Sequence, residues 1–227
     1  MRRLKQPSPA DLSGPRERRV MAICGDTQVG LWMVRNLGWN GLQVFAVVRS
    51  PEGLAAHSRS SSGAWQIENG PADRDAFAEE VEHLARELDV GSIMTISEGY
   101  HAALIACRDR FEPDIHVFSP RSEAFEKATD KDFMHQLCIE RGVPVAEGKT
   151  LQKVSPGGCD LSFPVVLRTR LQNTGDRRAP WKAAYAETPQ RLEQLREQVA
   201  DFQGNVLVQE YHPGAEDHVQ ILMHRGE

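Results

Sequence analysis

Short apolar runs alternate with amphipathic segments through the first half of the chain. Continuous apolar runs are typical of strands buried on both faces, and they occupy residues 19–24, 42–48, 92–96 and 116–118, with a shorter one at 64–67. Helical spacing of apolar residues is clearest in residues 73–88, where one face carries Phe77, Val81, Leu84, Ala85 and Leu88. Further helices are expected after Gly30 and at 102–110. This alternation predicts a parallel sheet covered by helices on both faces, a Rossmann-like leading domain over residues 20–120.

Small polar residues follow two of these strands, at the edge where such folds bind ligands. Gly25, Asp26 and Thr27 come after the first strand, and Ser97 and Glu98 after the strand that ends at residue 96. We treat these five as candidate substrate-binding residues, although Ser97 and Glu98 equally suit the cap of the next helix. The segment GDTQVG is not GxGxxG, and no acidic residue follows the second strand, so a dinucleotide cofactor is disfavoured.

The second half of the chain predicts a small α+β domain over residues 121–227. Thr129 or Asp130 suits the N-cap of a helix, and residues 189–199 predict another helix. Strands are expected at 163–168, 181–186 and 206–208, with Trp181 and Tyr185 in the core. The polar segment 171–180 separates the first two of these strands and predicts a mobile loop.

The end of the chain has a pattern of its own. Val206, Leu207 and Val208 form an apolar run, a polar stretch and Pro213-Gly214 follow, and Val219, Ile221 and Met223 then alternate with polar residues. A strand, a hinge and a returning strand would place Glu210 and Glu216 beside one crevice. Such a crevice suits adenosine, whereas the plain alternative is a β-hairpin with a solvated acidic turn.

Composition and charge narrow the classes of protein. The chain has 227 residues and a net charge of −5, and its 40% hydrophobic and 26% charged residues are typical of soluble globular proteins. Residues 1–19 hold six basic and two acidic residues and three prolines, which predicts a disordered leader. The acidic remainder offers no broad basic face for nucleic acid, and no run approaches the ~20 apolar residues of a membrane span. Widely spaced cysteines without a CxxC motif predict reduced thiols in a cytoplasmic protein, and no zinc motif is present.

Several segments together resemble the ATP-grasp superfamily, in its carbamoyl-phosphate-synthase-like, carboxylate–amine ligase type. The match covers the N-terminal portion of that family and runs over residues 20–227. The segments that carry it are Thr129-Asp130-Lys131, GVPVAEG at 142–148, FPVVLRTR at 163–170, Lys182, and VLVQEYHPGAE at 206–216.

The resemblance implies an ATP site between two lobes. The implied ATP-binding residues are Lys131, Arg168, Lys182, Gln209, Glu210, Tyr211 and Glu216. Of these, Lys131 and Arg168 would contact phosphates, Glu210 and the backbone near Tyr211 would lie at the adenine edge, and Glu216 would bind the ribose. Segment 171–180 would close over the triphosphate. Without the resemblance, Lys131 and Lys182 would equally well be solvated lysines.

Two departures limit what the resemblance implies. The family usually has lysine where this chain has Arg168, and arginine is a planar fork rather than a point charge. Residues 217–223 resemble the first strand of a second ATP lobe that is largely missing, so this chain is expected to be a truncated part of a longer ligase. Failing that, it is a short relative that completes its sheet by association. The ligands of Mg²⁺ are expected in the missing lobe.

The expected function is therefore part of an ATP-dependent ligase that activates a carboxylate as an acyl phosphate for attack by an amine or a thiol. The expected partners are ATP, a small carboxylate and amine substrate, and a second copy in a possible homodimer. This chain alone is expected to be inactive. The alternatives are a degenerate, non-catalytic nucleotide-binding or regulatory module and, less favoured, a Rossmann-type oxidoreductase.

Overall fold

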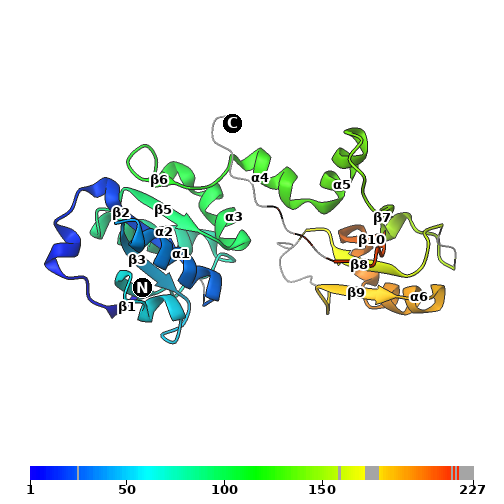
Figure 1. The fold of residues 1–227 in the computed structure, drawn as a ribbon, viewed down its shortest axis with the longest axis horizontal. Helices are drawn as coiled ribbons and strands as arrows, with labels where there is room; N and C mark the ends of the chain where they lie inside the picture. Colours follow the sequence, from blue (N-terminus) through cyan, green and yellow to red (C-terminus); the bar gives the residue numbers. More distant parts are fainter. Residues whose placement is uncertain (25, 158–159, 172–178, 216, 218, 220–227) are drawn as a thin grey trace. The chain divides into compact units, whose positions relative to one another are not determined.

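The computed structural model describes every residue except 25, 158–159, 172–178, 216, 218 and 220–227. The chain forms two compact units, Met1–Glu126 and Lys127–Glu227 (Figure 1). Each unit has its own sheet and its own apolar core. The expected fold class, a parallel-sheet domain followed by a small α+β lobe, is confirmed by these two sheets.

The leading unit is built on a six-stranded sheet with the order β1-β4-β3-β2-β5-β6. Its strands are β1 (Arg2–Lys5), β2 (Arg19–Ile23), β3 (Gln43–Val48), β4 (Ser61–Gln66), β5 (Ser92–Thr95) and β6 (His116–Val117). All neighbours from β4 to β6 pair in parallel, and only β1 is antiparallel. The chain therefore starts in the middle at β2, runs outward on one side through β3 and β4, and then on the other side through β5 and β6. This strand order places a topological switch point between β2 and β5.

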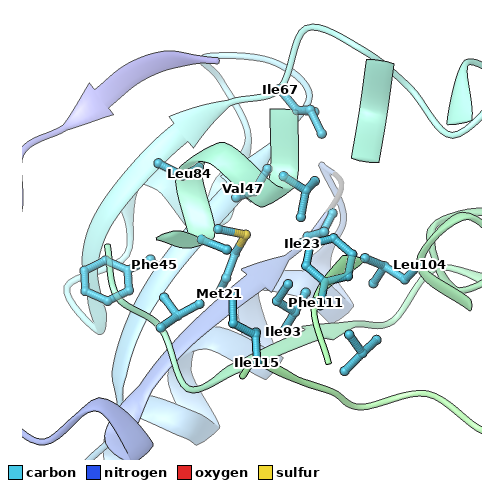
Figure 2. Packing of buried hydrophobic residues seen from close by; sticks show 14 of the residues in the cluster. Met21, Ile23, Phe45, Val47, Ile67, Leu84, Ile93, Leu104, Phe111 and Ile115 are labelled. Carbon is cyan, nitrogen blue, oxygen red and sulfur yellow. The ribbon is translucent and has the colours of Figure 1, made fainter. Parts of the chain in front are cut away.

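Helices cover both faces of this sheet, as the alternating pattern predicts. The helices are α1 (Gln28–Trp39), α2 (Arg74–Glu87) and α3 (Glu98–Ala106), with short 3₁₀ turns η3 (Leu54–His57) and η4 (Arg108–Arg110). Alternate residues of each strand face opposite cores. Met21 and Ile23 pack with α2 and α3 (Figure 2), whereas Ala22 and Cys24 pack with α1 and η3. Helix α3 begins at residue 98, four residues earlier than the sequence pattern indicates.

The first nineteen residues differ from the expected disordered leader. They form β1, the 3₁₀ turns η1 (Pro9–Leu12) and η2 (Arg16–Arg18), and the first residue of β2. Strand β1 pairs with β4, and Arg16 and Arg19 donate hydrogen bonds to backbone carbonyls of the leading unit. Local composition gives no hint of this order, because it comes from pairing with residues some sixty positions away.

The second unit carries an antiparallel sheet with the order β7-β10-β8-β9. Its strands are β7 (Gly148–Thr150), β8 (Val165–Thr169), β9 (Ala183–Ala186) and β10 (Val206–Glu210); its helices are α5 (Lys131–Glu140) and α6 (Pro189–Glu197), with η5 (Leu151–Lys153) and η6 (Ala200–Asn205). Helix α4 (Ser122–Thr129), which the sequence analysis does not predict, contains the boundary between the units. Val165, Leu167, Val206 and Val208 face the core beneath α6.

The side chains expected in the core of this unit fall into two groups. Trp181 packs against the core and donates its indole N–H to Gln198. Tyr185, by contrast, is 56% exposed, so its assignment to the core is wrong. In β9 the alternation places Tyr185 on the opposite face from Ala186, which is fully buried. An alternating pattern fixes which residues share a face but not which face is covered.

Candidate functional site

One face of the four-stranded sheet points away from the α6 core, and we call it the open face. It is defined by the partly or fully exposed residues Val166, Arg168, Ala183, Tyr185 and Gln209. Antiparallel register brings them together: Val166 lies opposite both Tyr185 and Gln209, and Arg168 lies opposite Ala183. The buried Leu207 completes this face beside Arg168. The open face therefore combines apolar surface, one amide and one cation.

Lys131, the first residue of α5, lies at the end of β8. Its ammonium donates to the carbonyls of Thr169, at 2.9 Å, and Arg170, at 3.4 Å. Asp130 caps the helix by accepting from the N–H groups of Asp132 and Phe133. A cation expected to contact phosphate is thus held at a fixed place beside the strand that bears Arg168.

The other two basic candidates are exposed. Arg168 extends from β8 on the open face, and among the residues that the structure describes it has no side-chain hydrogen-bond or ion-pair partner. Lys182 is also exposed and immediately precedes β9. An exposed guanidinium without an acidic partner is able to bind an anionic ligand without first breaking an internal ion pair.

The candidates on β10 make different contacts. Gln209 is on the open face, above Gly148 of β7, where a Cβ would come within 2.6 Å of the Gln209 Cγ. Glu210 alternates to the other face, where its carboxylate accepts the Ser162 N–H at 2.6 Å, and this bond lowers the pKa of the carboxyl. The N–H groups of Glu210 and Tyr211 donate to the carbonyls of Glu147 and Pro164, both at 2.9 Å.

Two predicted features lie wholly or mainly outside the described residues. Glu216, the expected ribose ligand, and the expected returning strand after it belong to this group. Of the expected phosphate loop, only residues 171 and 179–180 are described. Leu171 exchanges two hydrogen bonds with the Asn205 amide, at 2.9 and 3.2 Å, so the start of this loop is tied to the residue before β10.

In the leading unit, the candidates gather at the switch point between β2 and β5. Asp26 accepts the N–H groups of Arg49 and Ser50, at 3.0 and 3.3 Å, which ties the loops after β2 and β3 together. Thr27 caps α1 by accepting the Gly30 N–H at 3.1 Å. Both side chains thus have structural partners, while Gly25 lies outside the described residues.

The remaining pair follows β5. Ser97 is the N-cap residue of α3, but its hydroxyl makes no capping hydrogen bond, and its N–H donates to the Thr95 hydroxyl. Glu98 is the first residue of the helix, where a carboxylate is favourable to the helix dipole. The proposed alternative, a capping role, therefore does not describe the Ser97 side chain.

The sequence analysis assigns no role at the site to two residues of the second unit that contact its candidate residues. Arg170 forms a two-pronged ion pair with Asp130, and Tyr185 contacts Tyr211 edge-on across the open face. The pairing of Arg170 joins residues forty positions apart, for which a single sequence carries no signal. The exposure of Tyr185 follows from its alternation with Ala186 only once it is known which face of β9 is covered.

Over the part of the chain that the structure describes, no group of three or more His, Cys, Asp or Glu could hold a metal ion. In that same part, no helix is long and apolar enough to cross a membrane. Cys24, Cys107 and Cys138 are free thiols, and burial raises the pKa of Cys24 to about 12.

Comparisons with known proteins were informative for solved structures only, because no protein family and no curated protein matches this chain. L-amino acid ligase from Bacillus licheniformis matches with a TM-score of 0.61 and 14% identity, over 87% of this chain and 45% of that protein. N5-carboxyaminoimidazole ribonucleotide synthetase, in its ADP complex, matches with a TM-score of 0.59 and 17% identity, over 88% and 48%. The biotin carboxylase domain dimer of Hydrogenobacter thermophilus 2-oxoglutarate carboxylase, in complex with MgADP, ADP and bicarbonate, matches with a TM-score of 0.57 and 18% identity, over 87% and 45%.

The two units define an α/β protein in which a parallel-sheet domain precedes a small antiparallel lobe with a partly basic open face. This is the fold of the N-terminal portion of ATP-grasp enzymes, as the sequence resemblance predicts. The chain spans about half the length of these structures. At 14–18% identity the likeness establishes the fold and nothing beyond it.

Proposed function

We propose that the second unit supplies part of the ATP site of a ligase that activates a carboxylate as an acyl phosphate for attack by an amine or a thiol. The observation that carries this proposal is the open face, where Arg168 and Gln209 share one side of the sheet. ATP-grasp structures of the same fold include complexes with ADP and MgADP. Bound ATP would supply the phosphoryl group and, with Mg²⁺, the neutralisation of its charge.

The residues of this chain fit the nucleotide unevenly. Arg168 and Lys182 are exposed cations, and Lys131 is a positioned cation, so these three are assigned to the phosphates. Gln209 presents an amide that both donates and accepts, which suits the edge of a purine base. Glu210 fits less well at that edge, because its carboxylate already accepts the Ser162 N–H. No described residue is assigned to Mg²⁺.

These assignments give each side chain a simple task. Phosphoryl transfer depends mainly on positioning and on cations that stabilise developing charge, so Arg168 and Lys131 would orient phosphates rather than exchange protons. Asp26, Thr27, Ser97 and Glu98 remain the proposed substrate-binding residues of the leading unit. Among them, Ser97 is the N-cap residue of α3, and its hydroxyl makes no capping hydrogen bond to that helix.

Calorimetric titration of ATP, with and without Mg²⁺, tests the proposal. We expect micromolar to millimolar binding by the intact chain, and a loss of about tenfold or more in Arg168→Ala, because a charge-assisted hydrogen bond to phosphate is removed. Arg191→Ala is the matched control, since Arg191 is an exposed arginine on α6, the helix that covers the opposite face. Absence of binding by the unmodified chain would overturn the proposal, and equal affinities of chain and Arg168→Ala would refute the placement of phosphate on the open face.

A nucleotide-binding module without ligase activity is the second candidate. The observation that favours it is Arg168 itself, because this chain has a planar guanidinium where the family that it resembles usually has a lysine.

A second copy of the chain is also part of the proposal, since the matching biotin carboxylase domain is a dimer in its structure. Formation of ADP with a panel of carboxylates and amines separates ligase from binding module, and sedimentation velocity tests the dimer.

A further inference from the structure

The leading unit has a cavity of about 560 Å³ at the edge of its six-stranded sheet. Residues of β1, β4, the loop after β4 and α2 line it. Small-molecule sites in proteins have volumes of about 300–1,000 Å³, so this cavity is large enough to hold a ligand. None of its lining residues is a candidate ATP-binding or substrate-binding residue. The cavity is therefore a separate feature of the leading unit.

Trp65 of β4 forms an apolar wall of this cavity. The register of β1 and β4 places Arg3 directly opposite Trp65, and the guanidinium carbon lies 6.0 Å from the centroid of the indole, in a cation–π contact. The indole also packs edge-on against Phe45, with the ring centroids 6.1 Å apart. Ala76 and Leu84 of α2 add apolar surface to the lining. These contacts hold Trp65 in place, so the cavity offers a fixed apolar surface to a hydrocarbon group.

Helix α2 supplies most of the polar lining. The polar residues concerned follow one another at spacings of one, three and four, which places them along one stripe of the helix: Glu79, Glu80, His83 and Glu87. Two of the three carboxylates on this stripe have partners. Glu80 accepts the N–H groups of Glu68 and Asn69, both at 2.9 Å, and Glu87 accepts from Arg3 at 3.0 Å.

Glu79 and His83 are the polar groups of this stripe that remain available to a ligand. Both side chains are exposed and lie one helical turn apart, and in the described part of the chain neither makes a hydrogen bond or an ion pair. The Glu79 carboxylate is therefore a negative charge without a partner beside an apolar wall. A carboxylate binds a protonated amine through a charge-assisted hydrogen bond, and a neutral imidazole both donates and accepts.

We propose that this cavity binds a small amphipathic amine, whose ammonium group is held by Glu79 and whose apolar body packs against Trp65 and Leu84. His83 is the neighbouring group for a second polar atom of the ligand. Charge complementarity selects an amine over an acid of the same shape, and the apolar wall selects it over a bare ammonium ion. The site lies in the leading unit alone, and its occupation does not depend on the binding of ATP.

A plain alternative is that the cavity is a water-filled depression, in which Glu79 and His83 only keep the surface of α2 solvated. The two roles differ in selectivity. A depression has no preference among ligands of one shape, whereas a site built from one carboxylate and an apolar wall requires both the charge and the hydrocarbon.

Calorimetry on the full chain at neutral pH tests the inference with four probes: phenethylamine, 2-phenylethanol, 3-phenylpropionate and methylammonium. We expect phenethylamine to bind in the millimolar range or tighter, and each of the other three to bind at least about tenfold more weakly, because each lacks the charge-assisted hydrogen bond or the apolar contact. A bound ligand should also raise the melting temperature of the chain.

Two variants locate the probe, and one serves as a control. Glu79→Gln removes the charge and should weaken phenethylamine by about tenfold. Ala76→Leu fills the cavity with a larger apolar side chain and should reduce binding below detection. Glu140→Gln is the matched control, because Glu140 is an exposed glutamate at the end of α5 in the second unit, and it should bind as the unmodified chain does. Circular dichroism checks that each variant is folded.

Three results would overturn the inference. If the unmodified chain does not bind phenethylamine, or binds 2-phenylethanol equally well, the cavity is not an amine site. If Glu79→Gln retains the affinity, the ammonium group is not held by Glu79. If the folded Ala76→Leu variant retains it, the probe binds elsewhere on the chain.

Discussion

Arg170 and Asp130 form a bidentate ion pair that joins the end of β8 to the start of α5. The Nε and Nη2 atoms of Arg170 donate to the two carboxylate oxygens of Asp130, at 2.7 and 2.6 Å. The guanidinium lowers the pKa of the Asp130 carboxyl, and the carboxylate raises the pKa of Arg170. Because Asp130 also caps the helix that starts at Lys131, this pair positions Lys131 at the strand end.

Arg170→Ala should lower the free energy of unfolding of the second unit by about 1 kcal/mol, because a partly exposed but bidentate pair is lost. The same variant should weaken ATP more than adenosine, since Lys131 would lose its fixed place near the phosphates. Urea unfolding and calorimetry measure the two effects. Arg170→Lys serves as the control for charge, as a lysine keeps the charge but not the fork. Unchanged stability in Arg170→Ala would show that the pair contributes nothing in solution.

The ion pair also predicts a dependence of stability on pH. The pKa of Asp130 is lower in the folded chain than its ordinary value of 3.8, so the unfolded chain takes up the proton at higher pH. The stabilisation is therefore complete above about pH 4 and is lost as the pH falls through the lower, folded-state pKa.

Asp130→Asn isolates this effect, because asparagine still caps a helix but does not carry the charge. The difference in unfolding free energy between the chain and Asp130→Asn should be constant near neutral pH and should shrink below about pH 4. Urea titrations between pH 2.5 and 7 measure it. A difference that grows toward acid would contradict the sign.

Arg196→Ala should lower the stability of the second unit more than Arg170→Ala does. Its guanidinium is buried beneath α6 and donates to the carbonyls of Leu151, at 3.0 Å, and Val154, at 2.9 Å. Arg196→Ala leaves both carbonyls without these donors, and the expected cost is about 2 kcal/mol or more. Arg191→Ala, on the exposed side of the same helix, should cost under about 0.5 kcal/mol. Thermal unfolding of the two variants compares them, and equal melting temperatures would contradict the prediction.

The leading unit has no room for a side chain at Gly30. A Cβ at this position would lie 2.4 Å from the Cys24 carbonyl oxygen, a backbone atom that cannot rotate away. Gly30→Ala should therefore destabilise the leading unit by about 1–3 kcal/mol through displacement of α1 from β2. Gly70→Ala is the control, because nothing lies within 4 Å of its Cβ position. Similar unfolding midpoints for both variants would show that α1 is free to shift.

The sequence predicts the parallel sheet well because its strands are continuous apolar runs. Residues 42–48 are such a run, and they correspond to β3 within a residue at each end. The amphipathic residues 73–88 correspond equally closely to the covering helix α2. The pattern fails at β1, whose four residues include three basic ones, because its order comes from pairing with β4. The alternation of apolar and polar residues does not specify such long-range pairing. It also does not specify which face of a strand is covered, and Tyr185 lies on the uncovered face.

The candidate site, too, could be predicted from the sequence only in part. Sequence motifs locate Lys131, Arg168 and Gln209, which the fold places on or beside one small sheet. They do not show that Glu210 faces away from Gln209, because that depends on strand alternation at the end of β10. Nor do they reveal Arg170, whose partner is forty positions away.

Strand β1 has a consequence for the colloidal behaviour of the protein. Its sequence is RRLK, so the outer edge of the six-stranded sheet is short and strongly basic. Without it, the edge would be β4, whose sequence SSGAWQ has no charge to repel another strand. Charged, short edges discourage strand-to-strand association, whereas neutral ones invite it. A chain that lacks residues 1–6 should therefore aggregate at concentrations at which the full chain stays clear in light scattering, even where its remaining fold is intact.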